Sequence, residues 1–157
     1  MTKAQRVECL ALATPLGRFA IESGRLRELV AIDGCTPVPG SPASVAGITT
    51  LRGSVVVVLS GERLLDTDKE ELLIVFDRDD DRRLVGLAVE SISGVETVDT
   101  DIIIPPESFD GRIPDRELPI KAVILPMGRS RTGEPTFVLD TDALGESAPE
   151  PPKAASN

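Results

Sequence analysis

The sequence predicts an all-β protein of the sandwich or barrel type, with only very short helices. Roughly ten short apolar segments, many of them rich in β-branched residues, are spaced along the chain. Turn residues separate these segments, and the chain contains 13 glycines and 13 prolines. Almost no segment shows a sustained helical period. Short strands with frequent turns are typical of sandwiches and barrels.

The first two predicted strands form a hairpin. Val7–Ala13 reads VECLALA, and Arg18–Glu22 alternates as RFAIE. Pro15–Gly17 supplies the turn between them. The next segment, Ser23–Ile32, begins with turn residues. The spacing of its aliphatic residues predicts one helical turn, followed by a strand at Val30–Ile32.

The stretch Val45–Leu59, VAGITTLRGSVVVVL, organises the middle of the chain. Before it, Ser41 is typical of a helix N-cap, and Gly47 is typical of a left-handed helix end, which together predict a very short helix. A short apolar strand and an Arg-Gly turn follow. Val55–Leu59 is then five apolar residues long, which predicts a buried strand and is too short to cross a membrane.

The rest of the chain continues the β pattern. The segment after Leu59 is polar, and its Leu64 and Leu65 are expected to pack it against the core. Further strands and one short terminal turn are predicted at Leu72–Phe76, Leu84–Val89, Ile102–Ile104, Ile120–Leu125, Thr136–Leu139 and Asp142–Leu144.

Composition narrows the possible partners. The chain has 157 residues, enough for one domain or for two small barrels that share a core. Its formal net charge of -9 argues against a nucleic acid or an anionic membrane as the main partner. No apolar run approaches the roughly 18 residues of a membrane helix, and the N-terminus lacks a signal-peptide core. We therefore expect a cytoplasmic protein without direct membrane insertion.

The residues for catalysis and metal binding are missing. The chain has no histidine, no Gly-x-Ser-x-Gly motif and no phosphate-binding Gly-rich loop. Cys9 alternates with apolar neighbours and is expected in the core. Asp77, Asp79 and Asp81 alternate as in a calcium loop, but Arg82 stands where that loop needs glycine. We expect no catalytic residues, no metal site and no cofactor, so the protein is predicted not to be an enzyme.

Arg52 needs an explanation, because it lies at a turn between two apolar strands. A solvated turn residue is the simplest interpretation. However, the whole stretch PVPGSPASVAGITTLRGSVVVVL resembles the signature segment of the CheW-like domains, the adaptor modules of chemosensory arrays. A Pro-rich approach, a short helix ending in Gly, the pattern Gly-(apolar)-x-x-Leu-Arg-Gly and a Val-rich strand follow in the order typical of that family.

The resemblance implies a fold of two small five-stranded barrels packed on a shared core, with a groove between them. It implies a CheW-like domain of two barrel subdomains at residues 7–146. Residues 1–6 are expected to be a flexible N-terminus, and the composition of residues 147–157 predicts a disordered tail. The implied function is a non-catalytic adaptor that couples chemoreceptors to a histidine kinase. Its implied partners are a chemoreceptor cytoplasmic hairpin and a kinase regulatory domain.

The resemblance also implies a partner-binding surface centred on Arg52. Glu28 is expected to orient the Arg52 guanidinium through a charge-assisted hydrogen bond, and apolar residues would form the margin, although Leu26 also fits a plain core position. The implied partner-binding residues are Leu26, Glu28, Val45, Gly47, Arg52 and Gly53.

Two departures from the family pattern leave an alternative open. Family members usually carry an acidic residue and a leucine after the Val-rich strand, whereas this chain has Ser60 and Gly61. The loop near the closing hairpin is also less typical, which fits a divergent paralogue. The alternative is a small-molecule-binding β-barrel protein, which predicts a sizeable internal cavity with convergent polar groups.

Overall fold

The computed structural model describes residues 5–32, 34–76, 84–114, 118–126 and 133–147. The possible calcium loop at Asp77–Asp81 and nearly all of the two predicted flexible termini lie outside these residues. Within them the chain is mostly β, as the sequence predicted. The strands are β1 (Arg6–Thr14), β2 (Gly17–Glu22), β3 (Leu26–Ala31), β4 (Val45–Leu51), β5 (Ser54–Ser60), β6 (Leu72–Phe76), β7 (Leu84–Val89), β8 (Gly94–Asp99), β9 (Ile103–Ile104), β10 (Ile120–Ile124) and β11 (Thr136–Leu139).

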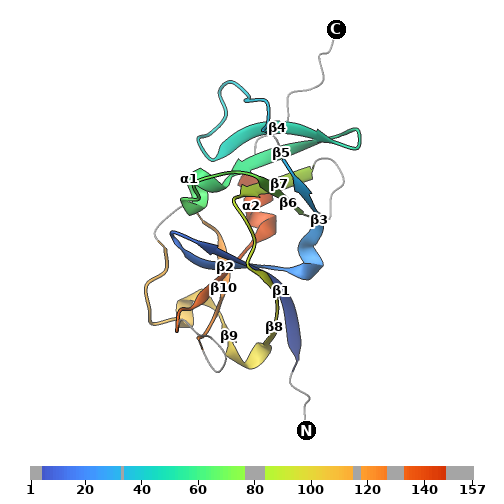
Figure 1. Cartoon of the computed structure of the whole chain (residues 1–157). Coiled ribbons are helices and arrows are strands. Elements are labelled where there is room, and N and C mark those ends of the chain that lie inside the picture. Colours follow the sequence, from blue (N-terminus) through green and yellow to red (C-terminus); the bar gives the residue numbers. More distant parts are fainter. Residues whose placement is uncertain (1–4, 33, 77–83, 115–117, 127–132, 148–157) are drawn as a thin grey trace.

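The described strands form two sheets (Figure 1). The first sheet has the order β8-β1-β2-β11-β10-β9, and the second has the order β3-β6-β7-β5-β4. Neighbouring strands are antiparallel except for β2 with β11 and β5 with β7, which are parallel. The prediction of two five-stranded units is therefore right for the second sheet, while the first has six strands. The two-residue β9 lies within the predicted strand Ile102–Ile104, and β8 is the strand that the sequence analysis did not predict.

Alternation along each strand separates the apolar side chains into three clusters. Leu10, Leu12 and Phe19 of the first sheet join Val57 and Leu59 of the second in a core that both sheets share. The opposite face of each sheet carries a smaller cluster of its own. Successive strand residues point to opposite faces of a sheet. Each sheet therefore packs one face against the shared core, and its opposite face curls around the smaller cluster.

The segment that follows β3 runs back to the other edge strand of the second sheet, β4. There Thr36 forms a bridge with Ile48. The Ile48 N–H donates to the Thr36 carbonyl and the Thr36 N–H donates to the Ile48 carbonyl, each at 2.8 Å. This link closes the sheet into the barrel-like shape expected from the sequence.

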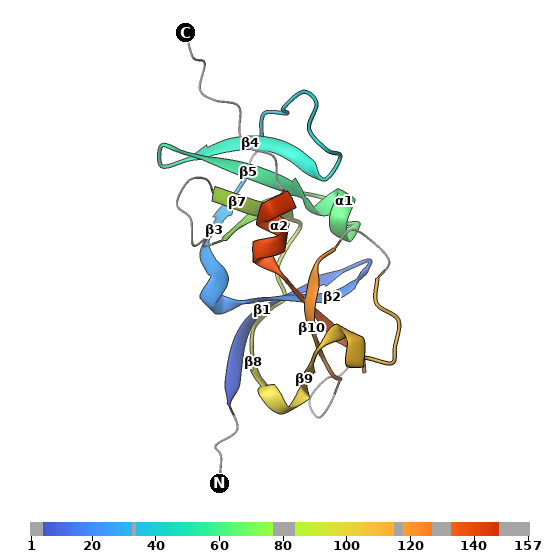
Figure 2. The same cartoon turned by 180° about the vertical axis from the view of Figure 1, so that it is seen from behind.

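The described helices are short, as predicted, but two of the helical segments that the sequence predicted are not found where it placed them. They are η1 (Ser23–Arg25), α1 (Gly61–Leu65), η2 (Thr100–Ile102), η3 (Pro106–Ser108) and α2 (Thr141–Ser147). The helical turn expected around Leu26 and Leu29 is wrong, because η1 ends before Leu26 and β3 follows it. In α1, Leu64 and Leu65 are buried, as expected. Figure 2 shows α2 between the two sheets, where Leu144 enters the shared core.

Ser60 and Gly61, where the chain departs from the family pattern, begin α1. The Ser60 hydroxyl accepts the Arg63 N–H at 3.2 Å as an N-cap. That hydroxyl also donates to the Glu70 carboxylate at 2.6 Å, and the same carboxylate oxygen accepts the Glu62 N–H at 3.1 Å. The family pattern places an acidic residue directly after the Val-rich strand. In this chain the carboxylate at the start of α1 comes from Glu70, which lies after the helix.

The helix predicted before Gly47 is absent, and Gly47 lies inside β4. Its φ is +154°, and it sits at an irregularity in the pairing of β4 with β5. A Cβ atom at this position would fall well inside contact distance of the Thr36 carbonyl oxygen. Gly47 is therefore explained by the close approach of the chain itself at the Thr36–Ile48 bridge, and not by a helix end.

Candidate interaction site at the β4–β5 hairpin

Arg52 and Gly53 form a two-residue turn between β4 and β5. Leu51 pairs with Ser54 to close the hairpin. Both turn residues have positive φ, 51° for Arg52 and 84° for Gly53. Two-residue hairpin turns favour this backbone because it matches the twist of the strands, and they normally place Asn, Asp or Gly at the first position. An arginine in this left-handed conformation costs about 1 kcal/mol or more.

The Arg52 side chain is exposed and held by a single carboxylate. Its side chain has 79% of its surface accessible, whereas that of Glu28 has 18%. One guanidinium nitrogen of Arg52 donates to Oε1 of Glu28 at 3.2 Å and the other lies 3.1 Å from Oε2. The contact is bidentate, which is the geometry that fixes a guanidinium best. The contact expected between Glu28 and Arg52 is therefore present, in a geometry that can orient the guanidinium.

Glu28 reaches Arg52 across the closed end of the second sheet. Glu28 lies on β3 and Arg52 follows β4, and these are the two edge strands of the five-stranded order. The ion pair therefore joins strands that only the curling of the sheet brings together. An ion pair this exposed is worth at most about 1 kcal/mol, so it orients Arg52 more than it stabilises the fold.

An exposed patch surrounds the turn. Val55 is 41% exposed, although the sequence predicted that the whole run Val55–Leu59 is buried. It pairs with the exposed Thr50 across the hairpin. Val57 and Leu59, on the same face of β5, enter the shared core. Val55 lies on that same face beyond the end of the core. Its place beside the turn is the sequence feature that would have predicted its exposure.

Of the other predicted site residues, two lie near the surface and two do not. Gly53 is exposed in the turn, and Leu26 is half-buried against the shared core. Val45 is buried, with 9% of its surface accessible, and it belongs to the shared core. Gly47 is buried beside Thr36. The sequence analysis expected Leu26, Val45 and Gly47 to form the apolar margin against a partner. The burial of Val45 and Gly47 in the free chain does not favour that role, which stays a prediction for both residues.

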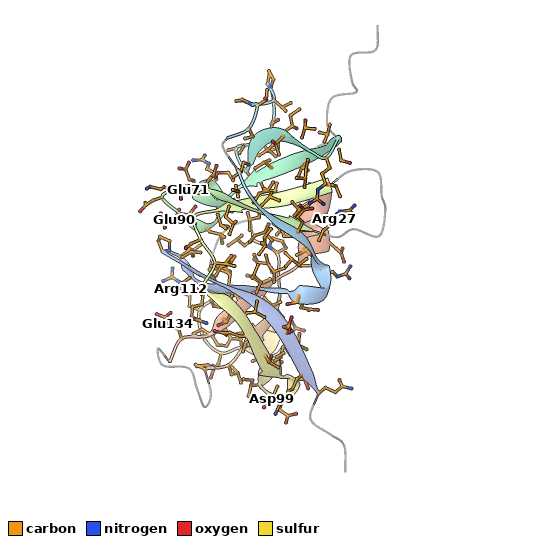
Figure 3. The ribbon with its side chains drawn as sticks, turned by 45° about the vertical axis from the view of Figure 1, so that its right-hand side comes forward. Arg27, Glu71, Glu90, Asp99, Arg112 and Glu134 are labelled. Carbon is orange, nitrogen blue, oxygen red and sulfur yellow. The ribbon has the colours of Figure 1, made fainter. Side chains whose placement is uncertain are left out.

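Arg52 is not the only charged residue at its end of the second sheet. Arg27, on β3, lies at this end, where Leu26 pairs with Phe76 and Leu51 with Ser54. Figure 3 shows Arg27 at one side of the sheet and both Glu71 and Glu90 at the other. The candidate site, which we call the Arg52 patch, consists of Leu26, Glu28, Thr50, Arg52, Gly53 and Val55.

The described residues offer no metal centre and no membrane helix. Among them, no group of three or more histidine, cysteine, aspartate or glutamate side chains is placed to hold a metal ion. None of the helices in the same part of the chain has the length and apolarity needed to cross a bilayer.

Comparison with known proteins gives a consistent result. A profile of the CheW-like domain family matches residues 9–148. A protein described as "Probable chemotaxis protein CheW" from Rhizobium etli is 30% identical over 92 residues, which is 55% of this chain and 58% of that protein. The matched region thus spans less than two thirds of the relative.

A solved structure has the same fold. The scaffolding protein TtCheW from Thermoanaerobacter tengcongensis superposes with a TM-score of 0.69. The superposition covers 87% of this chain and 90% of the other, at 16% sequence identity. Because the sequence identity is so low, this similarity shows a shared fold and nothing further.

Proposed function

The chain belongs to the CheW-like domain family, and on that basis we propose that it is a non-catalytic adaptor of a chemosensory pathway. It couples a chemoreceptor to a histidine kinase by binding both. The receptor contributes the helical hairpin of its cytoplasmic part, and the kinase contributes its regulatory domain. The two similar proteins described above, a probable chemotaxis protein and a scaffolding protein, support this role.

One observation carries the proposal for the site: the hairpin turn places an exposed arginine in an unfavourable backbone conformation, and a bidentate carboxylate fixes its side chain. Asparagine or glycine would suit the turn better than Arg52. Strained, exposed residues whose side chains are held in one place are typical of functional sites. A guanidinium offers a flat apolar face and forked donors, which is why arginine is frequent among interface hot spots.

The Arg52 patch has the composition of a small docking surface. Val55 and Leu26 supply apolar contact, Thr50 supplies a hydroxyl, and Arg52 supplies the charged centre. Interfaces combine such an anchor with a surrounding rim that excludes water. Glu28 holds the anchor in place before the partner arrives, which reduces the entropy lost on binding.

The shared core gives the adaptor its means of action. An adaptor transmits a signal by fixing the relative placement of its partners, so its own two sheets must hold a fixed orientation. Phe19 of the first sheet and Leu59 of the second lie in one continuous buried cluster. The two sheets are therefore packed as one body, which allows a partner bound on one sheet to be held relative to a partner bound on the other.

Replacing Arg52 tests the proposal. Arg52→Asn is expected to keep or raise the melting temperature, because Asn-Gly is a preferred sequence for this turn. It is expected to weaken binding to a receptor cytoplasmic fragment or to a kinase regulatory domain by about 30-fold, which corresponds to about 2 kcal/mol. Titration calorimetry of the purified full chain with each partner measures the loss.

A matched control removes another exposed arginine from an ion pair. Arg6 contacts Asp99 at 3.2 Å on the first sheet, and 71% of its side chain is accessible. Arg6→Ala is expected to bind both partners as the unaltered chain does. Equal losses from Arg6→Ala and Arg52→Asn would assign the effect to net charge. If Arg52→Asn binds both partners as tightly as the unaltered chain, the Arg52 patch is not part of the interface.

A further inference from the structure

The first sheet encloses a hollow that no part of the adaptor function uses. Its cavity volume is about 220 Å³, and it is partly open to solvent. The apolar part of its wall comes from four strands: Val7 and Cys9 of β1, Ile103 of β9, Ala122 of β10 and Val138 of β11. The hollow therefore lies on the face of the first sheet that points away from the shared core.

Small side chains on that face account for the hollow. Ala11 and Ala20 are paired across β1 and β2, and Cys9 and Ala122 lie on the same face. The buried cluster on this face also contains Val98, Ile124 and Val138, and the hollow lies where Cys9 and Ala122 leave space beside Val138. Protein interiors are normally filled to high density. Among the residues that the structure describes, the small side chains of Cys9 and Ala122 leave part of this face unfilled.

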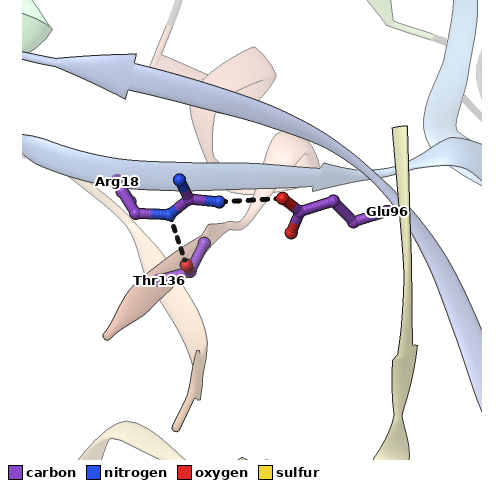
Figure 4. Close-up of polar contacts among 3 residues, drawn as sticks. All are labelled: Arg18, Glu96 and Thr136. Carbon is purple, nitrogen blue, oxygen red and sulfur yellow. Dashed lines mark hydrogen bonds and ion pairs between the residues drawn. The ribbon is translucent and has the colours of Figure 1, made fainter. Parts of the chain in front are cut away.

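The charged groups at the two ends of this face are already paired. Arg18 donates to the Glu96 carboxylate at 2.9 Å and to the hydroxyl of Thr136 at 3.3 Å, and Figure 4 shows both contacts. At the other end, Glu22 lines the hollow and forms an ion pair with Lys121. A charged ligand would therefore lose its hydration without gaining a counter-ion, which is costly in an apolar site.

The thiol in the wall is also neutral. Burial, together with the nearby Glu22 and Glu96 carboxylates, raises the pKa of Cys9 from 9.0 to about 11. At neutral pH it stays protonated, so it behaves as a small apolar group and not as a nucleophile. The remaining polar groups on the wall are the Glu22 carboxylate and Thr100, which can each accept a hydrogen bond.

We propose that the hollow of the first sheet binds a small, uncharged, mainly apolar molecule about the size of one substituted ring. An apolar cavity of about 150 Å³ is known to take up a benzene-sized molecule. The hollow here is larger and has polar acceptors on its wall, so a hydroxyl on the ring can donate to Glu22 or Thr100. Drug-sized molecules need larger pockets.

This site is separate from the Arg52 patch. The lining residues described above belong to the first sheet or to η2, whereas the Arg52 patch belongs to the second sheet and its flanking turn. Figure 1 shows β4 and β5 at one end of the molecule and β8 and β9 at the other. A ligand in the hollow therefore leaves Arg52 accessible, and the adaptor can bind partners and ligand together.

Nuclear magnetic resonance titration of the full chain with benzyl alcohol tests the proposal. We expect saturable shifts confined to the strands of the first sheet, with a dissociation constant of about 1 mM or lower. Benzoate and benzylammonium have the same ring but carry a charge. We expect the affinity of each to be at least about tenfold lower than that of benzyl alcohol. No receptor or kinase is present, so the result is independent of the adaptor proposal.

A pair of matched variants localises the binding. Ala122→Leu fills the hollow and is expected to abolish the shifts while keeping or raising the melting temperature, since it fills a cavity. Ala31→Leu makes the same change at an exposed position of β3 and is expected to bind normally. The proposal fails if the unaltered chain shows no saturable shifts, if Ala122→Leu binds as well as Ala31→Leu, or if a charged analogue binds more tightly than benzyl alcohol.

Discussion

Gly47→Ala is expected to lower the free energy of unfolding by about 4 kcal/mol. The new methyl group would collide with the Thr36 carbonyl oxygen, and φ at this position is +154°, where side chains are strained. Relief of the collision would break the Thr36–Ile48 bridge, in which both hydrogen bonds are 2.8 Å long. That bridge holds β4, whose end carries Arg52, so the variant is expected to lose partner binding as well.

Gly94→Ala is the matched control for Gly47→Ala. Gly94 has a similar φ of +147°, but no neighbouring atom lies within 4 Å of where its Cβ would be. Its loss is therefore limited to backbone strain, about 1 to 2 kcal/mol. Urea unfolding followed by far-UV circular dichroism measures both, because the chain has no Trp or Tyr to report by fluorescence. Equal losses would show that the close approach to Thr36 contributes nothing.

Phe19→Ala is expected to cost about 4 kcal/mol and to unfold both sheets in a single transition. Phe19 is fully buried in the shared core, and its ring centre lies 5.9 Å from that of Phe137. The cavity left by the ring would weaken the contact between the sheets, because both contribute side chains to that cluster. Scanning calorimetry is the measurement, with Phe19→Ala compared directly with the unaltered chain.

Phe109→Ala provides the comparison for Phe19→Ala. Phe109 also contacts Phe137, at 6.0 Å between ring centres, but it is only partly buried at the margin of the shared core. Because Phe109 buries less apolar area on folding than Phe19 does, Phe109→Ala is expected to lower the free energy of unfolding by only about 1 to 2 kcal/mol. Two separate transitions in Phe19→Ala, one for each sheet, would contradict the view that the sheets form one body.

The β elements were predictable because hydrophobic patterning and turn residues agree along most of the chain. The hairpin of β1 and β2 and the strands β6, β7, β10 and β11 lie close to where alternation placed them. The helix predicted before Gly47 failed for a physical reason. Glycine serves equally well as a helix end and as a site of close backbone approach, and the second use depends on Thr36, which is distant in the sequence.

The candidate site was predictable in its centre and not at its edges. The Arg-Gly step placed Arg52 at a turn, and the resemblance pointed to Glu28 as its partner, which the geometry matches. The burial of Val45 depends on where the shared core ends, which no local pattern records, whereas the exposure of Val55 could have been inferred from its place beside the turn. The hollow beside Ala122 was equally hidden, because it arises from small residues on separate strands.

The most direct test of the adaptor proposal is hydrogen–deuterium exchange of the full chain with and without its partners. The account predicts that amides of the β4–β5 hairpin, from Thr50 to Val55, exchange more slowly when a receptor cytoplasmic fragment or a kinase regulatory domain is bound. The same amides in Arg52→Asn should show no such slowing at equal partner concentration. Unchanged exchange in the hairpin of the bound chain, with protection appearing at another surface, would contradict the account.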